Sequence, residues 1–347
     1  VMNASRRLHD NFALEHAVER ARSLGKPLLL LEPLPLSAEG ATMRSHRWVS
    51  DGMLVNARAA RRHGVAYVPW IETESGQVES LLGELAERAA LCVFDDPPSL
   101  RERQRLIERV SSWRTPVEAV DGVGLLPLRG PPREFLRAVD FRRCAHRLLP
   151  GALARHPMRE PLAGYVGTPL DGAAFFGGGL ALPERLARLD LRWLKEPARR
   201  ESLLRALPLD FEVGAVSELG GAESAEGRLH RFLSQRLAHY AEQRNLPALP
   251  GTSELSADLH FGHLSAHRVF AELARLEDWS PEVTSPRKAG RREGWWQLSP
   301  PAEAFVEQLV TWRELSCNGA HWRADFHRYE SLPAWARATL AKHRADP

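Results

Sequence analysis

The stretch from Asp10 to Leu31, DNFALEHAVERARSLGKPLLLL, holds one complete helix-then-strand unit. Its apolar positions recur at helical spacing, at Leu14, Ala17, Val18 and Ala21. Asp10 can cap this helix, Gly25 ends it, and Pro27 leads into a strand at Leu28 to Leu31. The segment is therefore predicted to be one αβ unit.

The same unit recurs three more times. Further helices are predicted at 49–62, 81–89 and 100–112, and strands at 65–70, 90–94 and 117–120. Strands that alternate with helices of this length predict a parallel, doubly wound sheet covered on both faces, over residues 1–130. Such a domain usually opens with a strand, whereas residue 1 stands almost at a helix, so we expect the N-terminus to be clipped.

The pattern changes after residue 130. Prolines and the run Gly177 to Gly179 predict an interdomain connection at 131–190. Beyond it, at 191–347, only helical periodicity returns, so the second domain is predicted to be all-α. Its clearest stripe comprises Leu229, Phe232, Leu233, Leu237 and Tyr240.

Composition narrows the class of protein. A chain of 347 residues with 44% hydrophobic residues predicts two domains, and no apolar run reaches the length of a membrane span. We therefore expect a cytoplasmic protein that does not associate with membranes. Three scattered cysteines indicate neither a disulfide framework nor a zinc site. A net charge of +3 excludes binding of nucleic acid by bulk charge alone, but a locally basic groove would still suffice.

The segment from Tyr240 to Phe270, YAEQRNLPALPGTSELSADLHFGHLSAHRVF, carries the strongest chemical signal. A helix, a proline-bounded turn and the element Gly251 to Ser256 lead into a short helix. Hydroxyls and free N–H groups at a helix start suit an anion such as a diphosphate. The alternative is simple N-capping by Thr252 or Ser253, which needs no ligand.

This segment resembles the flavin-binding signature of the photolyase/cryptochrome family. Tyrosine, an Arg-Asn-x-Pro turn, Gly-Thr-Ser-x-Leu-Ser and the continuation LHFGHLS follow one another in the family's order. The resemblance implies FAD as cofactor. It places Tyr240, Thr252, Ser253, Leu255 and Ser256 at the phosphates and ribityl chain of FAD.

Other segments agree with this resemblance. RRLHDNFALEHAVERARSLGKPLLLLEPL at 6–34 and VDGVGLLPLR at 120–129 resemble the family's N-terminal antenna domain, which can carry a second chromophore whose identity stays open. YESLPAWARATLAKHRADP at 329–347 is most similar to class II cyclobutane pyrimidine dimer photolyases. The implied activity is light-dependent splitting of pyrimidine dimers in DNA by reduced FAD. DNA with such dimers is the implied partner, bound by a monomer, and the choice between cyclobutane and (6-4) lesions stays open.

The segment FVEQLVTWRELSCN at 305–318 resembles the family helix that borders both flavin and lesion. Gln308 and Trp312 are four residues apart, so they share a face and could contact a flipped-out pyrimidine pair. A glutamate of this helix commonly contacts the lesion in the family, and here Glu307 and Gln308 compete for that place. If Gln308 holds it, a carboxyl function has been lost. The alternative is that Trp312 is a core residue and Gln308 a surface residue.

The loop PRKAGRR at 286–292 precedes Trp295 and Trp296. Cations beside aromatic rings could follow a phosphate backbone and stack on bases, while a solvated charge run is the alternative. The predicted DNA-binding residues are Arg287, Lys288, Arg291, Arg292, Trp312 and Arg313. His263 and His267 are four apart but lack a third ligand, so no metal site is predicted.

The resemblance also implies further helices that close over the flavin ring, and the sequence stops at Pro347 before them. We therefore expect an incomplete flavin-binding domain that holds FAD poorly. Two functions follow: a repair enzyme represented by part of its chain, or a non-repairing cryptochrome-like photosensor or degenerate paralogue.

Overall fold

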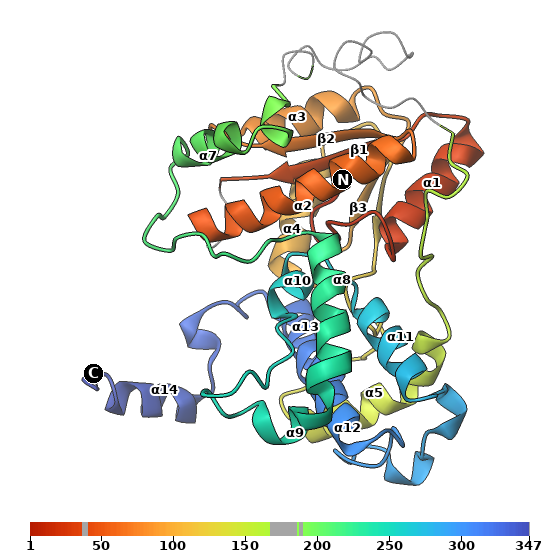
Figure 1. Cartoon of the computed structure of the whole chain (residues 1–347), viewed down its shortest axis with the longest axis vertical. Helices are drawn as coiled ribbons and strands as arrows, with labels where there is room; N and C mark the ends of the chain where they lie inside the picture. Colours follow the sequence, from red (N-terminus) through yellow and green to blue (C-terminus); the bar gives the residue numbers. More distant parts are fainter. Residues whose placement is uncertain (37–40, 167–185, 187–189, 347) are drawn as a thin grey trace.

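The computed structural model describes residues 1–36, 41–166, 186 and 190–346 (Figure 1). Its first part alternates helices and strands: α1 (Phe12–Leu24), β1 (Leu29–Leu34), α2 (Met43–Arg62), β2 (Ala66–Ile71), α3 (Gln77–Ala86), β3 (Cys92–Asp95), α4 (Leu100–Val110) and β4 (Val117–Val120). The later α-helices are α5 (Ala138–Leu153), α7 (Pro197–Arg205), α8 (Ala222–Arg231), α9 (Tyr240–Gln243), α10 (Ser256–His260), α11 (Ala266–Leu276), α12 (Pro300–Val306), α13 (Arg313–Trp322) and α14 (Ala334–Lys342). Two π-helical segments continue α8 and α12, at Phe232–Arg236 and Glu307–Trp312.

The strands are parallel, as predicted. β1 pairs with β2 from Leu29 opposite Ala66 to Leu34 opposite Ile71, and β3 pairs with β4. The N-terminal residues lie between these two pairs: Met2 N donates to Leu31 O at 2.8 Å, and the Val1 amino group donates to Val93 O at 2.7 Å. The first residues thus connect the two halves of the sheet.

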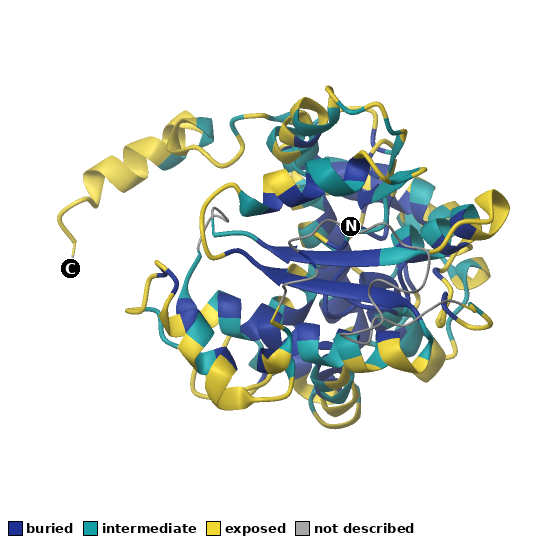
Figure 2. Cartoon of the chain, turned by 90° about the horizontal axis from the view of Figure 1, so that it is seen from above, coloured by how far each residue is buried: buried dark blue, intermediate teal, exposed yellow. Residues whose placement is uncertain are grey.

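Both faces of the sheet are covered, because neighbouring strand residues enter different cores. Leu30 and Tyr67 pack with α1 and α2, whereas Leu31 and Val68 pack against α3 and α4. Figure 2 shows the buried strands between layers of helices. This is the doubly wound domain that the αβ alternation predicts.

Two helix starts differ from the sequence prediction. Asn11, rather than Asp10, caps α1, because its side chain accepts a hydrogen bond from Leu14 N while the Asp10 side chain is held by other residues. Gly25 ends the helix as expected, at a φ of 59° that favours glycine. α2 begins at Met43 and not at 49, because Thr42 and Ser45 form a capping box ahead of it.

The second part is helical: among the described residues beyond Val120, the only β-pairing is a single bridge between Asp210 and Thr42. Its core joins α5, α8, α11 and α12 and contains Phe141, Leu149, Phe232, Phe270 and Phe305. Part of the segment predicted as a connection is therefore helix α5, packed in this core, while Gly177 to Gly179 lie outside the described residues. None of the described helices is long and apolar enough to span a membrane.

Candidate functional site

The Gly251–Ser256 element lies directly against α9. A Cβ added to Gly251 would stand 2.5 Å from the backbone carbon of Gln243, closer than real Cβ atoms approach. Glycine is therefore required here, because the loop and the helix pack backbone to backbone. This packing places the Gly251–Ser256 element beside the helix that begins with Tyr240.

The hydroxyls of this element are open to solvent. Thr252 and Ser256 are exposed and Ser253 is half-buried, and the Thr252 and Ser256 hydroxyls have no hydrogen-bond partner within the described part of the chain. Leu255, by contrast, is 1% exposed, so only its backbone can contact a ligand. α10 has five residues, so its dipole adds little. Attraction for an anion must come from the hydroxyls and N–H groups.

Tyr240 is a buried packing residue. Its ring meets Phe305 edge to face with 5.4 Å between centroids, and Phe232 with 5.5 Å. The Arg244 guanidinium lies 5.9 Å from the same ring centroid. Burial raises the pKa of Tyr240, so its phenol stays protonated and able to donate.

Arg228 and Asp258 form a buried ion pair next to the Gly251–Ser256 element. Arg228 of α8 donates from Nε and Nη2 to the two carboxylate oxygens of Asp258, both at 2.7 Å, and it also donates to Leu219 O. Asp258 is 0% exposed and stands two residues after Ser256. Its burial raises its pKa, an effect that the Arg228 charge opposes. Sequence reasoning missed this pair because nothing local links residues 30 apart.

In the segment 305–318, which is expected to border a lesion, the two candidate lesion-contacting residues Glu307 and Gln308 lie in different environments. Glu307 is buried and receives two hydrogen bonds from Arg142, at 2.5 and 3.2 Å, and one from Thr311 at 2.8 Å. Gln308 is half-buried and has no side-chain partner among the described residues, and Trp312 is 50% exposed. The geometry therefore leaves Gln308 and Trp312 available to a ligand and commits Glu307 to the interior.

The basic loop is only partly as expected. Arg287, Arg291 and Arg292 are exposed and Lys288 is half-buried. However, Trp295 and Trp296 are each 3% exposed, so the expectation that they stack on bases is wrong. They pack in the helical core, where Trp295 lies flat on His146 with 3.8 Å between ring centroids.

Arg313, also predicted to bind DNA, points toward the α/β part. Its Nη1 pairs with Glu314 at 2.8 Å and its Nη2 donates to Val123 O at 2.8 Å. Its guanidinium is therefore occupied by contacts within the chain. Arg313 is therefore less available to a ligand than the exposed Arg287, Arg291 and Arg292.

The histidine pair is buried. Gly221 N donates to His263 Nδ1 at 2.8 Å, and burial lowers the pKa values of His263 and His267 to about 3. Both rings are therefore neutral at pH 7.

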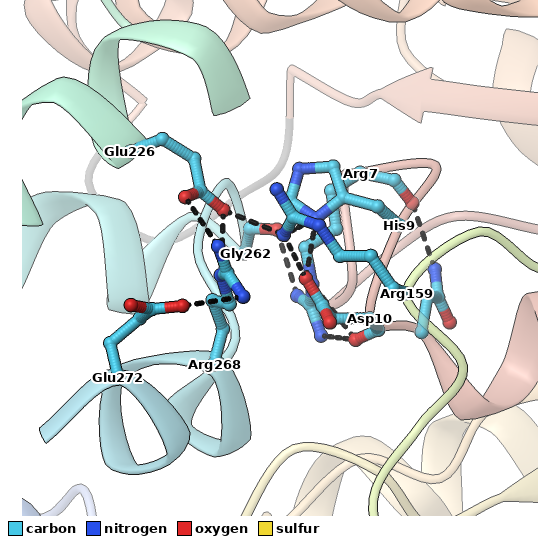
Figure 3. A network of polar contacts seen from close by, with 9 residues as sticks. Arg7, His9, Asp10, Arg159, Glu226, Gly262, Arg268 and Glu272 are labelled. Atoms are coloured by element: carbon cyan, nitrogen blue, oxygen red, sulfur yellow. Dashed lines mark hydrogen bonds and ion pairs between the residues drawn. The ribbon is translucent and has the colours of Figure 1, made fainter. Parts of the chain in front are cut away.

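His9, Asp10 and Glu226 offer ligand atoms within 4.8 Å of one another, the spacing of a metal site. Arg159 occupies the centre of this group, with Nη1 at 2.5 Å from Asp10 Oδ2 and 2.8 Å from Glu226 Oε1 (Figure 3). The guanidinium supplies the positive charge that these groups need. We therefore do not assign a metal to them.

Known proteins resemble this chain in sequence and in fold. No family model matches the chain. It is 26% identical over 349 residues to the deoxyribodipyrimidine photo-lyase of Methanothermobacter thermautotrophicus, which covers 100% of this chain and 66% of that protein. The chain thus spans about two thirds of the length of that relative.

Solved structures agree in fold. The Synechocystis cryptochrome superposes with a TM-score of 0.61 at 16% identity, over 98% of this chain and 66% of that one. An archaeal photolyase from Sulfolobus tokodaii, solved with two FAD molecules, superposes with a TM-score of 0.54 at 12% identity, over 98% and 65%. Both structures share with this chain a parallel α/β domain joined to a helical body. In sequence the chain is similar to deoxyribodipyrimidine photo-lyases, and in fold it is similar to photolyases and cryptochromes.

Proposed function

We propose that the protein acts in light-dependent repair of cyclobutane pyrimidine dimers in DNA, with reduced FAD as cofactor, as in class II photolyases. The observation that carries the proposal is the Gly251–Ser256 element. It presents the hydroxyls of Thr252 and Ser256, which have no partner among the described residues, beside the helix that begins at Tyr240, in a segment that matches the flavin-binding signature in order and spacing. Similarity along this whole chain to 66% of the length of a named deoxyribodipyrimidine photo-lyase supports it.

In this proposal, Thr252, Ser253 and Ser256 would hold the diphosphate of FAD by hydroxyl and backbone hydrogen bonds, and the Leu255 backbone would contribute to binding the ribityl chain. Tyr240 fixes the helix behind them. When bound, reduced FAD supplies the electron that splits the dimer and takes it back afterwards. The chain's own work is to bind the cofactor and to hold the extruded bases against Gln308 and Trp312.

A second function is favoured by one specific observation. Glu307 is held inside by Arg142, so the exposed position beside Trp312 carries the amide Gln308 rather than a carboxyl group. If dimer splitting needs a carboxyl at this place, the protein is a cryptochrome-like photosensor or a paralogue that keeps the fold without repair. Flavin binding is common to both functions, so it cannot separate them.

Repair of a dimer-containing oligonucleotide under blue light separates the two. The assay uses the full-length protein, reduced and anaerobic, with flavin content measured by absorbance. With FAD supplied in excess, to offset the weak binding expected from the sequence, we expect bound flavin and slow repair that Gln308→Glu accelerates. Bound flavin with no repair in either protein would assign the photosensor, and a protein that binds no flavin when supplied with FAD would contradict both.

A further inference from the structure

A cavity of about 740 Å³ lies where the α/β part of the chain meets the helical part. Its walls come from α1, from the end of β4 with the loop that follows, from the end of α5 and from the first turn of α11. Small-molecule sites typically have volumes of about 300 to 1,000 Å³. Its described lining includes no residue of the Gly251–Ser256 element or of the segment 305–318. We call this space the junction cavity and define it by Phe12, Glu15, Glu19, Asp121, Ala152 and His267.

Three carboxyl groups of the junction cavity have no cationic partner among the described residues. Glu15 and Glu19 are four residues apart on α1, so they share one face of the helix. Glu15 Oε2 accepts a hydrogen bond from Met158 N at 3.0 Å, and Glu19 is exposed. Asp121 follows β4 and accepts from Leu128 N at 2.6 Å. Negative charge is therefore present on two different walls.

The arginines that line the cavity do not neutralise these groups. Arg20 pairs with Glu118 at 3.3 Å, and His16 Nε2 lies 2.5 Å from the same carboxylate. Arg155 is exposed and stacks over the Phe12 ring, 5.3 Å from its centroid. Carboxylates outnumber arginines four to two among the lining residues. The cavity therefore favours a positively charged ligand.

Asp121 lacks positive charge most clearly. Burial raises its pKa to about 6; the nearby Asp96 and Glu314 add to this rise, while the Leu128 N–H and Arg129 oppose it. Arg129 pairs with Asp96 instead, at 3.3 Å. A cation bound in the cavity would stabilise the ionised form of Asp121.

His267 is independent evidence for a polar ligand. It lines the cavity, is only 5% exposed, and has no hydrogen-bond partner among the residues that the structure describes. Its ring meets Phe12 edge to face with 5.3 Å between centroids. Burial lowers its pKa to about 3, so the ring is neutral at pH 7 and one nitrogen can accept a hydrogen bond. Buried polar groups are normally satisfied, so a donor from a ligand would fill this place.

We propose that the junction cavity binds an aliphatic diamine or polyamine, with ammonium groups at the α1 wall and at Asp121 and with His267 accepting an N–H. Acidic groups on two walls suit a ligand with two separated positive charges. The apolar part of the lining includes Leu126, Pro127 and Ala152, which suits a methylene chain. A single metal ion fits less well, because the described groups close enough together to hold one are His9, Asp10 and Glu226, outside this cavity.

The test is calorimetric titration of the whole chain with 1,5-diaminopentane at pH 8, where Asp121 is ionised, in about 0.15 M salt to screen exposed charges. Asp121→Asn keeps the oxygen that accepts from Leu128 N and removes the charge. It should weaken binding about 10-fold or more, as should Glu15→Gln/Glu19→Gln. The matched control Glu74→Gln/Glu87→Gln removes two exposed carboxylates outside the cavity and should leave the affinity unchanged.

Two further measurements test the ligand chemistry. His267→Phe keeps a ring against Phe12 but removes the acceptor, so it should weaken diamine binding several-fold. The uncharged analogue 1,5-pentanediol should not bind. No binding of the diamine, or equal affinity in the wild type and both acid variants, would overturn the proposal. Displacement of the bound diamine by riboflavin would also overturn it and would assign the cavity to a flat chromophore. None of these measurements uses FAD, light or DNA, so they stand apart from the proposed function.

Discussion

Arg142 and Glu307, 165 positions apart, form a buried two-point ion pair in which Nη2 donates to Oε1 at 2.5 Å and Nε donates to Oε2 at 3.2 Å. The pair joins α5 to the segment expected to border the lesion. Because Glu307 is held in the interior by this pair, the neighbouring Gln308 is the side chain of the two that remains accessible to a substrate.

Gln308→Glu should increase light-dependent dimer repair at least tenfold in the flavin-loaded protein, because it places a carboxyl group where the family commonly has one. Its melting temperature should stay within about 2 °C of wild type, since Gln308 is half-buried and has no side-chain partner among the described residues. The measurement is initial repair rate under saturating light. No gain in rate would show that Gln308 does not face the lesion.

Glu307→Gln should act on stability instead. Removing one partner of a buried ion pair leaves Arg142 uncompensated and costs about 3 to 5 kcal/mol of unfolding free energy. Urea unfolding measures this, and Glu293→Gln, at an exposed glutamate, is the matched control. A loss below about 1 kcal/mol would contradict the internal role of Glu307.

Thr252→Ala and Ser256→Ala should each weaken FAD binding about 10- to 100-fold in the full-length protein, because a hydrogen bond to a charged group contributes about 1.5 to 3 kcal/mol. The exposed Ser80 supplies the control variant Ser80→Ala. Flavin dissociation constants come from fluorescence titration. Unchanged affinity in both test variants would remove these hydroxyls from the flavin site.

Asp258→Asn should weaken FAD binding indirectly, because Asp258 is buried and does not itself contact the proposed ligand. The change leaves Arg228 buried with a weaker acceptor, so both stability and FAD affinity should fall. Replacing the ion pair by an apolar pair, in Arg228→Met/Asp258→Leu, should recover the free energy of unfolding more than the affinity for FAD, if the ion pair positions the Gly251–Ser256 element. Parallel recovery of both would indicate a purely structural role.

Stability should fall as pH drops below about 6.5. Burial lowers the pKa values of His263 and His267 to about 3, well below the ordinary 6.5. Between these values the unfolded chain takes up protons that the folded chain refuses, so each histidine removes about 1.4 kcal/mol per pH unit. Urea unfolding from pH 7.5 to 5 should show this slope. His267→Gln should reduce it by one proton, and an unchanged slope would show that His267 titrates normally.

Local patterns were sufficient to predict the α/β alternation, and the predicted strand 117–120 coincides with β4 (Val117–Val120). Local sequence patterns gave wrong helix boundaries where a helix cap or tertiary packing sets the helix. α2 gains a first turn and a half from its capping box, although MRSHRW carries no apolar periodicity. α5 was hidden by Pro150, which lies in its last turn, because a proline inside a helix removes a backbone hydrogen bond and normally predicts a break.

The candidate site likewise has one part that could be predicted from the sequence and one part that could not. The Gly251–Ser256 element was visible because its residues are contiguous. The pairs Arg142–Glu307 and Arg228–Asp258 were not, because each arginine carries no local sign of the carboxylate that it will meet. The buried state of Trp295 and Trp296 was equally hidden, since aromatic residues beside a basic loop look alike whether they face solvent or core.

Residues 1–5 lie between β1 and β3, so they can bond to β3 only after that strand has been synthesised. Val1 bonds to Val93, and the N–H groups of Ala4 and Ser5 bond to Asp95 Oδ2 at 2.9 and 3.0 Å. On a ribosome adding about 5 to 20 residues per second, this segment emerges several seconds before its partners exist. This segment can therefore settle only after β3 has been made, and a nascent chain that stalls before residue 92 would display an unfilled sheet edge to chaperones.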